Sequence, residues 1–135
     1  MKNKNKKVLV VDDDPSSLHL VQKLLMRDGY ETVPLEKGRD VLEKVKEINP
    51  DCILLDVLLP DVMGVEVAGR LQDDPETADI PIVFMTVTID IDKDKGDQVI
   101  KVYEKEYRAF AKPVHPQKLL SVVRKEINKR VNRNH

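Results

Sequence analysis

The stretch Lys7-Val-Leu-Val-Val-Asp12-Asp13-Asp14-Pro15 decides the fold of this 135-residue chain. Its first five residues are almost continuously apolar, the pattern of a strand that is covered on both faces of a parallel sheet. Asp14 is a favourable N-cap and Pro15 suits the first position of a helix. The stretch therefore predicts a buried strand, an acidic turn and a helix in immediate succession.

Four further short runs predict strands, at residues 31–35, 52–55, 81–85 and 107–111. The runs at 52–55 and 81–85 are also continuously apolar, which favours central positions in a sheet. The runs at 31–35 and 107–111 contain polar residues, and Pro34 cannot donate to a ladder, so both are predicted to be edge strands.

Between the predicted strands lie segments whose apolar residues have helical spacing. These predicted helices cover 15–29, 39–49, 64–72, 93–105 and the residues from 116 onward. Strands that alternate with helices predict an open, doubly wound α/β fold. We expect a five-stranded parallel sheet of order 2-1-3-4-5 in a flavodoxin-like three-layer sandwich. At this length one domain over residues 1–135 is expected, with a core of about residues 6–130.

Composition excludes several classes of protein. The chain has 23 Lys+Arg against 24 Asp+Glu, a net charge of −1, which argues against a strongly basic nucleic-acid binder. The single cysteine, Cys52, cannot form an internal disulfide, and the residues around Lys7 do not resemble a secretion signal. No apolar run approaches the length that spans a bilayer. A cytoplasmic protein that binds neither membranes nor nucleic acid is predicted.

Polar residues follow the carboxyl ends of four predicted strands: Asp12, Asp13 and Asp14, then Asp56, Thr86 and Lys112. Ligands of open parallel sheets bind at that edge, so these side chains are expected to converge. Clustered carboxylates must take up protons or share a cation, and an all-oxygen donor set points to Mg²⁺, or to Mn²⁺ in its place. Because Mg²⁺ completes its shell with phosphate oxygens, a phosphoryl group is the expected ligand, contacted by Lys112 and Thr86.

The cluster contains no Ser, Cys or His, so the predicted nucleophile is a carboxylate that forms an aspartyl phosphate. Asp14 is best explained as the cap of the following helix. Asp56 follows an apolar strand, where a carboxylate without a partner would be costly to bury, so a functional role is favoured.

Four motifs occur in order: Val8-Leu-Val-Val-Asp12-Asp13-Asp14-Pro15, Ile53-Leu-Leu-Asp56-Val-Leu-Leu-Pro60-Asp-Val-Met-Gly64, Ile80-Pro-Ile-Val-Phe-Met-Thr86 and Lys112-Pro113. Together they resemble the receiver domain of two-component response regulators, over roughly residues 6–130. The resemblance implies that Asp56 is the phosphoacceptor, supplied by a phosphohistidine on a partner histidine kinase or histidine phosphotransfer protein. It also implies that Asp13, Asp56 and the backbone carbonyl of Leu58 bind Mg²⁺ directly, and that Asp12 acts through water.

The resemblance further implies that Thr86 closes onto the phosphoryl group and that Lys112 pairs with it. A cis peptide is expected between Lys112 and Pro113, and Pro60 and Gly64 match the turn after the acceptor. Such a domain is a signalling module rather than an enzyme, with only self-phosphorylation and self-dephosphorylation as chemistry. Its output passes to an effector protein or to an output domain outside this chain, with dimerisation as a further possibility.

The chain departs from the family pattern in places. Ala109 stands where an aromatic switch residue is common, and Val87 is bulkier than the residue usual after the threonine. The segment between Thr86 and Lys112 is longer than usual, so the surface formed by the fourth helix and fifth strand should be atypical.

Two alternatives remain open from the sequence. The chain also resembles haloacid-dehalogenase-type phosphatases, in which Asp12 would be the nucleophile and Asp14 the acid. Asp56 and the short chain count against that interpretation. A receiver fold that works unphosphorylated, as a docking module, is the other alternative.

Overall fold

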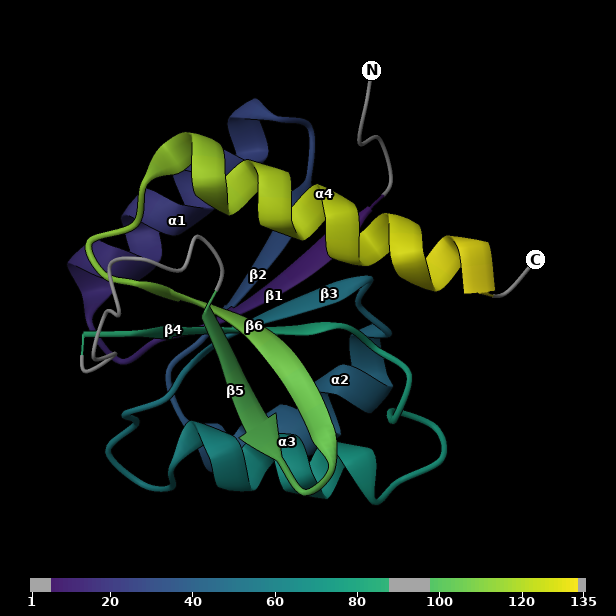
Figure 1. The fold of residues 1–135 in the computed structure, drawn as a ribbon. Helices are drawn as coiled ribbons and strands as arrows, with labels where there is room; N and C mark the ends of the chain where they lie inside the picture. Colours follow the sequence, from purple (N-terminus) through teal and green to yellow (C-terminus); the bar gives the residue numbers. More distant parts are fainter. Residues whose placement is uncertain (1–5, 88–97, 134–135) are drawn as a thin grey trace.

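The computed structural model describes residues 6–87 and 98–133, which form one sheet between two layers of helices (Figure 1). The strand order is β2-β1-β3-β4-β6-β5, and all neighbouring strands are parallel except the antiparallel pair β5 and β6. The elements are β1 (Lys7–Val11), α1 (Pro15–Arg27), β2 (Glu31–Leu35), η1 (Gly38–Asp40), α2 (Val41–Ile48), β3 (Cys52–Asp56), α3 (Gly64–Gln72), β4 (Ile82–Thr86), β5 (Gln98–Val102), β6 (Lys105–Ala111) and α4 (Pro116–Arg133).

Successive side chains along each strand point to opposite faces of the sheet, which divides the core into two layers. In β1, Val8 and Val10 pack into the layer under α1 and α4, whereas Leu9 and Val11 pack into the layer under α2 and α3. All four side chains are fully buried. Helices on both faces therefore account for the continuous apolar runs of the central strands, as the sequence predicted.

The five predicted strands and the flavodoxin-like α/β sandwich are confirmed. Asp14 caps α1, accepting a hydrogen bond from the backbone N–H of Ser16 at 3.2 Å. A short 3₁₀ turn precedes α2, which ends at Ile48 because Asn49 adopts a left-handed conformation (φ 48°) and Pro50 follows. Within the described ranges, no helix combines the length and apolar character needed to cross a membrane.

The helix predicted at 93–105 is wrong over its described part. Residues 93–97 lie outside the described residues, but Gln98–Val102 is strand β5, joined to β6 by a turn at Tyr103 and Glu104. Exposure alternates from exposed Val99 and Lys101 to half-buried Ile100 and buried Val102, a period of two. β-Branched residues at three of five positions favour this strand.

This hairpin corrects two further expectations. The sheet has six strands in its described part rather than five. The strand predicted at 107–111 belongs to β6, which lies between β4 and β5 and is therefore not an edge strand. The edge prediction holds for β2, whose one described neighbour is β1.

Candidate functional site

Two acidic side chains meet because adjacent strands end in register. Val11 pairs with Leu55, so Asp12 follows β1 beside Asp56 at the end of β3. Asp12 is fully buried and Asp56 is 5% exposed, whereas Asp13 is exposed. Each of the three offers a carboxylate oxygen, and these oxygens lie within 4.8 Å of one another. The predicted convergence of Asp12, Asp13 and Asp56 is therefore present in the structure.

Lys112 joins the two buried carboxylates. Its Nζ lies 2.6 Å from Oδ2 of Asp12 and 2.6 Å from Oδ2 of Asp56, and its side chain is 12% exposed. The backbone N–H of Asp14 donates to Oδ1 of Asp12, and that of Leu58 donates to Oδ1 of Asp56, each at 3.0 Å. Both oxygens of each carboxylate thus have a donor, which offsets the cost of burying two acids together.

The pKa values of Asp12 and Asp56 shift in opposite directions. Burial raises the pKa of Asp56, and hydrogen bonds from Lys112 and Leu58 offset this only in part. Burial also opposes ionisation of Asp12, but hydrogen bonds from Lys112, Ser17 and the Asp14 N–H outweigh it and hold its pKa below the ordinary value. Burial would lower the pKa of Lys112, yet its hydrogen bonds to both carboxylates raise it, so the lysine stays charged.

Thr86 and Lys112 lie at the same carboxyl edge of the sheet, at the end of β4 and directly after β6. Thr86 ends β4, is 2% exposed and pairs with Ala111, and the backbone N–H of Lys112 donates to its carbonyl oxygen at 3.1 Å. The Lys112–Pro113 peptide is cis, as predicted. Ala109, the position where the resemblance implies a switch aromatic, is buried.

The neighbouring aromatic, Tyr107, is buried on the α2–α3 side of the sheet. Its hydroxyl is held 2.6 Å from Nε2 of Gln72 on α3, and its ring packs edge-on against Phe84 at 5.7 Å between centroids. Gln72 also donates to the carbonyl of Val102, at 3.1 Å. Tyr107 therefore ties the hairpin to α3 rather than lying at the carboxylate cluster.

Hydrogen bonds hold the loop from β3 to α3 in place. The Gly64 N–H donates to the Val57 carbonyl at 2.8 Å, and exposed Pro60 lies between them. Asp61 accepts from the backbone N–H groups of Gly38 and Arg39, at 3.0 and 2.9 Å, which joins this loop to the one after β2. This role of Asp61 was not predicted from the sequence, because its partners lie in a different loop.

Position 64 requires glycine because the backbone of Asp56 and Val57 passes very close to it. Even the small substitution Gly64→Ala should therefore have a large effect on stability. A Cβ at this position would collide with the carbonyl oxygen of Asp56 and lie 3.0 Å from Cα of Val57. Because backbone must move, we expect Gly64→Ala to lower the free energy of unfolding by about 2 kcal/mol in urea denaturation.

Gly69→Ala in the same helix is the matched control. The three atoms nearest to its Cβ would all belong to the flexible side chain of Tyr103, the closest at 3.3 Å, and an interior helical glycine is unfavourable relative to alanine. Equal stability losses in the two variants would contradict the close-approach explanation of Gly64.

The donor set fits a hard divalent cation. Three carboxylates from two adjacent strand ends present oxygen atoms within one ion's reach, and no His or Cys accompanies them in the described part of the chain. Such a set suits Mg²⁺ or Mn²⁺ rather than zinc. Lys112 supplies the positive charge that the two buried carboxylates share in this structure.

This arrangement of acids, threonine and lysine on a doubly wound sheet agrees with a family match. The model of the response regulator receiver domain matches residues 8–124. The chain belongs to this family. The resemblance expected from the four sequence motifs is thereby confirmed.

Relatives agree with the assignment. The polar-differentiation response regulator DivK of Brucella ovis is 38% identical over 81 residues, which cover 60% of this chain and 66% of that protein. The chain thus matches just under two thirds of the length of this curated relative. A protein assigned as a response regulator from Chloroflexus aurantiacus has 28% identity and a TM-score of 0.77, covering 93% of this chain and 99% of that one.

The N-terminal domain of a response regulator/sensory box/GGDEF protein from Carboxydothermus hydrogenoformans is similar as well. It has 25% identity and a TM-score of 0.78, with 96% of this chain and 100% of that chain covered. The six-stranded sheet in the described part of this chain is thus compatible with close similarity to known response-regulator structures.

Proposed function

We propose that Asp56 accepts a phosphoryl group from a phosphohistidine of a partner histidine kinase or histidine phosphotransfer protein. Family membership and the buried position of Asp56 between Lys112 and the Leu58 N–H support this role. Residues 1–135 then form a single receiver domain with its core at about 6–130, acting in the cytoplasm as a signalling protein. Its output is the binding of an effector protein or of an output domain.

The transfer is a displacement at phosphorus. A carboxylate oxygen of Asp56 forms the new O–P bond while the P–N bond of the phosphohistidine breaks, and the imidazole nitrogen leaves with that electron pair and takes up a proton. Lys112, already 2.6 Å from Asp56, pairs with a phosphoryl oxygen as the acceptor loses its negative charge. The Thr86 hydroxyl donates to another phosphoryl oxygen.

Asp13, Asp56 and the Leu58 carbonyl would hold Mg²⁺ or Mn²⁺ directly, with Asp12 acting through water. The bound ion would screen the negative charge on the phosphoryl oxygens. The carboxylates themselves orient the site: Asp12, held by Lys112 and the Asp14 N–H, keeps the lysine next to the acceptor.

The single observation that carries the proposal is the placement of the Lys112 ammonium 2.6 Å from both Asp12 and Asp56 at the carboxyl edge of the sheet. A small-molecule phosphodonor tests it. Incubation with acetyl phosphate and Mg²⁺ should add one acid-stable, hydroxylamine-sensitive phosphoryl group per chain, seen by intact-protein mass spectrometry. An unmodified mass at every donor and Mg²⁺ concentration would favour the unphosphorylated docking module instead.

The phosphatase alternative has less support. The family match covers residues 8–124, and the Asp14 carboxylate caps α1 through the Ser16 N–H, as an ordinary helix cap does. Asp14, which would be the general acid of the phosphatase mechanism, thus already has a structural role as a helix cap.

The raised pKa of Asp56 predicts how metal binding depends on pH. A proton and a metal ion compete for the same carboxylate, so Mg²⁺ affinity should fall as the pH drops toward the raised pKa of Asp56. Calorimetric titrations from neutral pH down to about pH 5 measure this, with each affinity corrected for protein that has unfolded. In Asp56→Asn the remaining affinity should depend less on pH. The same pH dependence in both proteins would contradict the assignment.

A further inference from the structure

Leu58 serves the proposed site through its backbone, so its contribution depends on the path of the loop between β3 and α3. Its N–H donates to Oδ1 of Asp56 at 3.0 Å, and its carbonyl is a proposed metal ligand. Its side chain is 41% exposed, so burial of that side chain does little to hold the residue in place. Contacts elsewhere in the loop must therefore fix the backbone at Leu58.

Asp61, later in the same loop, binds the segment that follows β2. Its Oδ1 accepts from the Gly38 N–H at 3.0 Å and its Oδ2 accepts from the Arg39 N–H at 2.9 Å. These N–H groups belong to the first turn of η1, where helical hydrogen bonds cannot satisfy them. Neither Lys37 before η1 nor Asp40 before α2 supplies a side-chain cap. The carboxylate of Asp61 therefore caps this helical segment from a different loop.

Close packing accompanies these hydrogen bonds. Gly38 is buried, and Leu59 of the β3–α3 loop is only 7% exposed. A Cβ at residue 38 would collide with Cγ1 of Val62 and would lie 3.1 Å from Cδ1 of Leu59. The two segments thus meet with no room for a side chain at residue 38, and the loop has little freedom while Asp61 keeps its hydrogen bonds.

The chain between Leu58 and Asp61 is short and conformationally restricted. It consists of Leu59 and Pro60. The ring of Pro60 fixes its own φ, and it also disfavours the helical region for Leu59. Because few torsions are free to adjust, a displacement of Asp61 is passed on to the backbone at Leu58.

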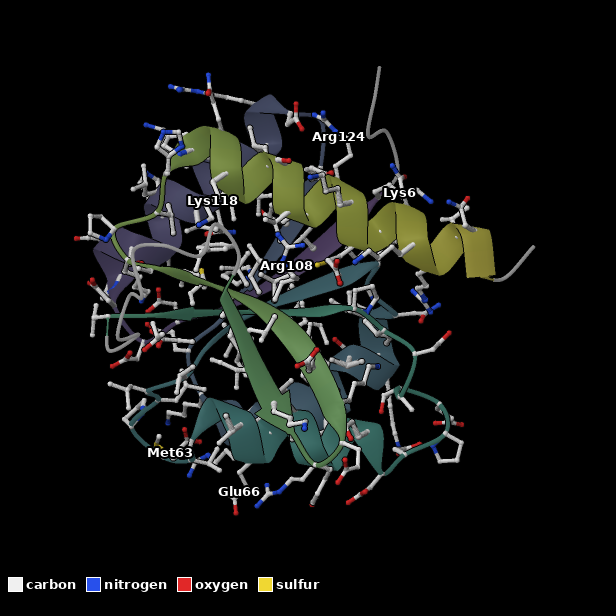
Figure 2. All side chains as sticks on the ribbon, viewed as in Figure 1. Lys6, Met63, Glu66, Arg108, Lys118 and Arg124 are labelled. Atoms are coloured by element: carbon white, nitrogen blue, oxygen red, sulfur yellow. The ribbon has the colours of Figure 1, made fainter. Side chains whose placement is uncertain are left out.

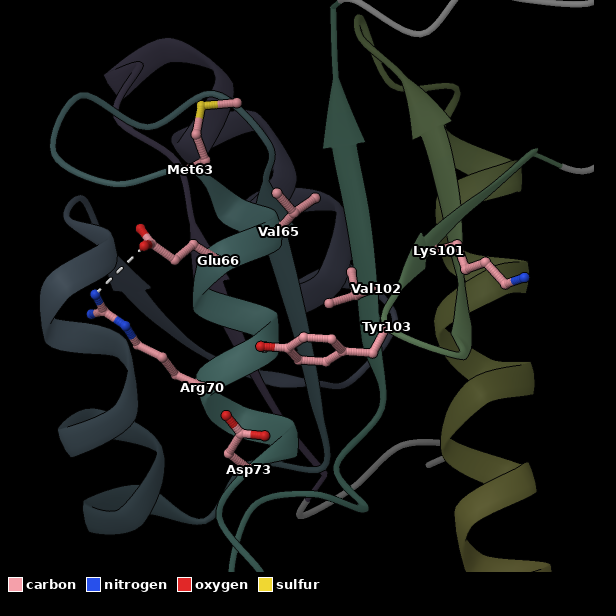
Figure 3. Close-up of a pocket in the computed structure, with 9 residues that line it drawn as sticks. Met63, Val65, Glu66, Arg70, Asp73, Lys101, Val102 and Tyr103 are labelled. Carbon is pink, nitrogen blue, oxygen red and sulfur yellow. Dashed lines mark ion pairs between the residues drawn. The ribbon is translucent and has the colours of Figure 1, made fainter.

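The side chains at the start of α3 point elsewhere. Met63 provides no side-chain cap for α3 and is 44% exposed. Figure 2 shows Met63 and Glu66 reaching outward from α3. Glu66 turns toward Arg70, 4.0 Å away, beside the groove between α3 and β5 (Figure 3). The side-chain hydrogen bonds that join this loop to a separate segment therefore come from Asp61.

We propose that Asp61 is a positioning residue of the phosphorylation site. Its two hydrogen bonds hold the backbone at Leu58, so that the N–H of Leu58 reaches Asp56 and its carbonyl is available to the cation. Asp61 acts through Leu58 and is not itself a metal ligand. The metal part of this inference rests on the ligand set proposed above, whereas the placement of the Leu58 N–H does not.

Hydrogen exchange of single amides, followed by NMR without metal, tests the positioning role. In Asp61→Ala the Leu58 amide should exchange about tenfold faster than in wild type. The Asp14 amide is the matched control, because it donates to Oδ1 of Asp12 at the same distance of 3.0 Å in the neighbouring turn. Its exchange rate should not change. An unchanged rate at Leu58, or equal acceleration of both amides, would overturn the proposal.

Calorimetric titration with Mg²⁺ tests the link to the proposed metal site. Asp61→Ala should bind Mg²⁺ roughly fivefold more weakly than wild type. Asp61→Asn removes the same charge but keeps one oxygen acceptor, so its affinity should lie between the two. Wild-type affinity in Asp61→Ala, or equal losses in both variants, would overturn this link. A wild type that binds no Mg²⁺ would instead contradict the proposed ligand set, and the exchange of the Leu58 amide would still decide the role of Asp61.

Discussion

Replacing Lys112 by alanine should lower the free energy of unfolding by about 3 kcal/mol when Mg²⁺ is absent. The ammonium group is the cation that Asp12 and Asp56 share, and both carboxylates are almost fully buried. Removing it leaves two neighbouring buried charges without a counter-ion. Urea denaturation in the presence of a chelator measures the loss.

Lys46→Ala is the matched control for this prediction. Lys46 lies 2.6 Å from Asp74, the same distance as in the Lys112 pairs, but its side chain is 43% exposed. Exposed ion pairs contribute little, so this variant should lose far less stability. Similar losses in the two variants would show that burial is not what makes Lys112 important.

The same Lys112→Ala variant separates structural support from metal binding. Saturating Mg²⁺ should restore much of the lost stability, because a cation again neutralises the carboxylates. Its Mg²⁺ affinity should be unchanged or tighter than in wild type, since a competing positive charge is gone. The response to phosphorylation should be impaired. A collapse of Mg²⁺ affinity would contradict the placement of Lys112 beside the proposed metal ligands.

Asp56→Asn should abolish the covalent phosphoryl adduct completely, because the amide cannot form an acyl phosphate. Stability should fall little, since Lys112 keeps its contact with Asp12 and the repulsion between two carboxylates is removed. Intact mass after incubation with acetyl phosphate and Mg²⁺ measures the adduct.

Asp12→Asn is the matched control on the adjacent strand. It should still form the adduct, more slowly, because it removes a positioning carboxylate but leaves the acceptor. If Asp12→Asn abolished the adduct while Asp56→Asn retained it, the phosphatase-type mechanism with Asp12 as nucleophile would be correct.

The sequence was sufficient for the features that depend on local pattern. Continuous apolar runs marked β1, β3 and β4, and the Asp14-Pro15 pair marked the start of α1. The carboxylate cluster was also predictable, because parallel strands bring their carboxyl ends to one edge and polar residues stood at those ends.

The hairpin at β5 and β6 was not predictable in the same way. Its apolar residues Val99, Ile100, Val102 and Tyr103 have spacings that fit a helix face and a strand equally well. The long-range register with β6 and the tight turn at Tyr103 decide between them. The role of Asp61 likewise depends on two loops that lie far apart in sequence, so no local pattern could assign it.

We expect Asp56, and no neighbouring acid, to receive the phosphoryl group. Borohydride reduces an acyl phosphate to an alcohol, which marks the modified residue for peptide mass spectrometry. After treatment with acetyl phosphate and Mg²⁺, the mark should appear at Asp56 alone. A mark at Asp12 or Asp13 would contradict the assignment of Asp56 as the phosphoacceptor.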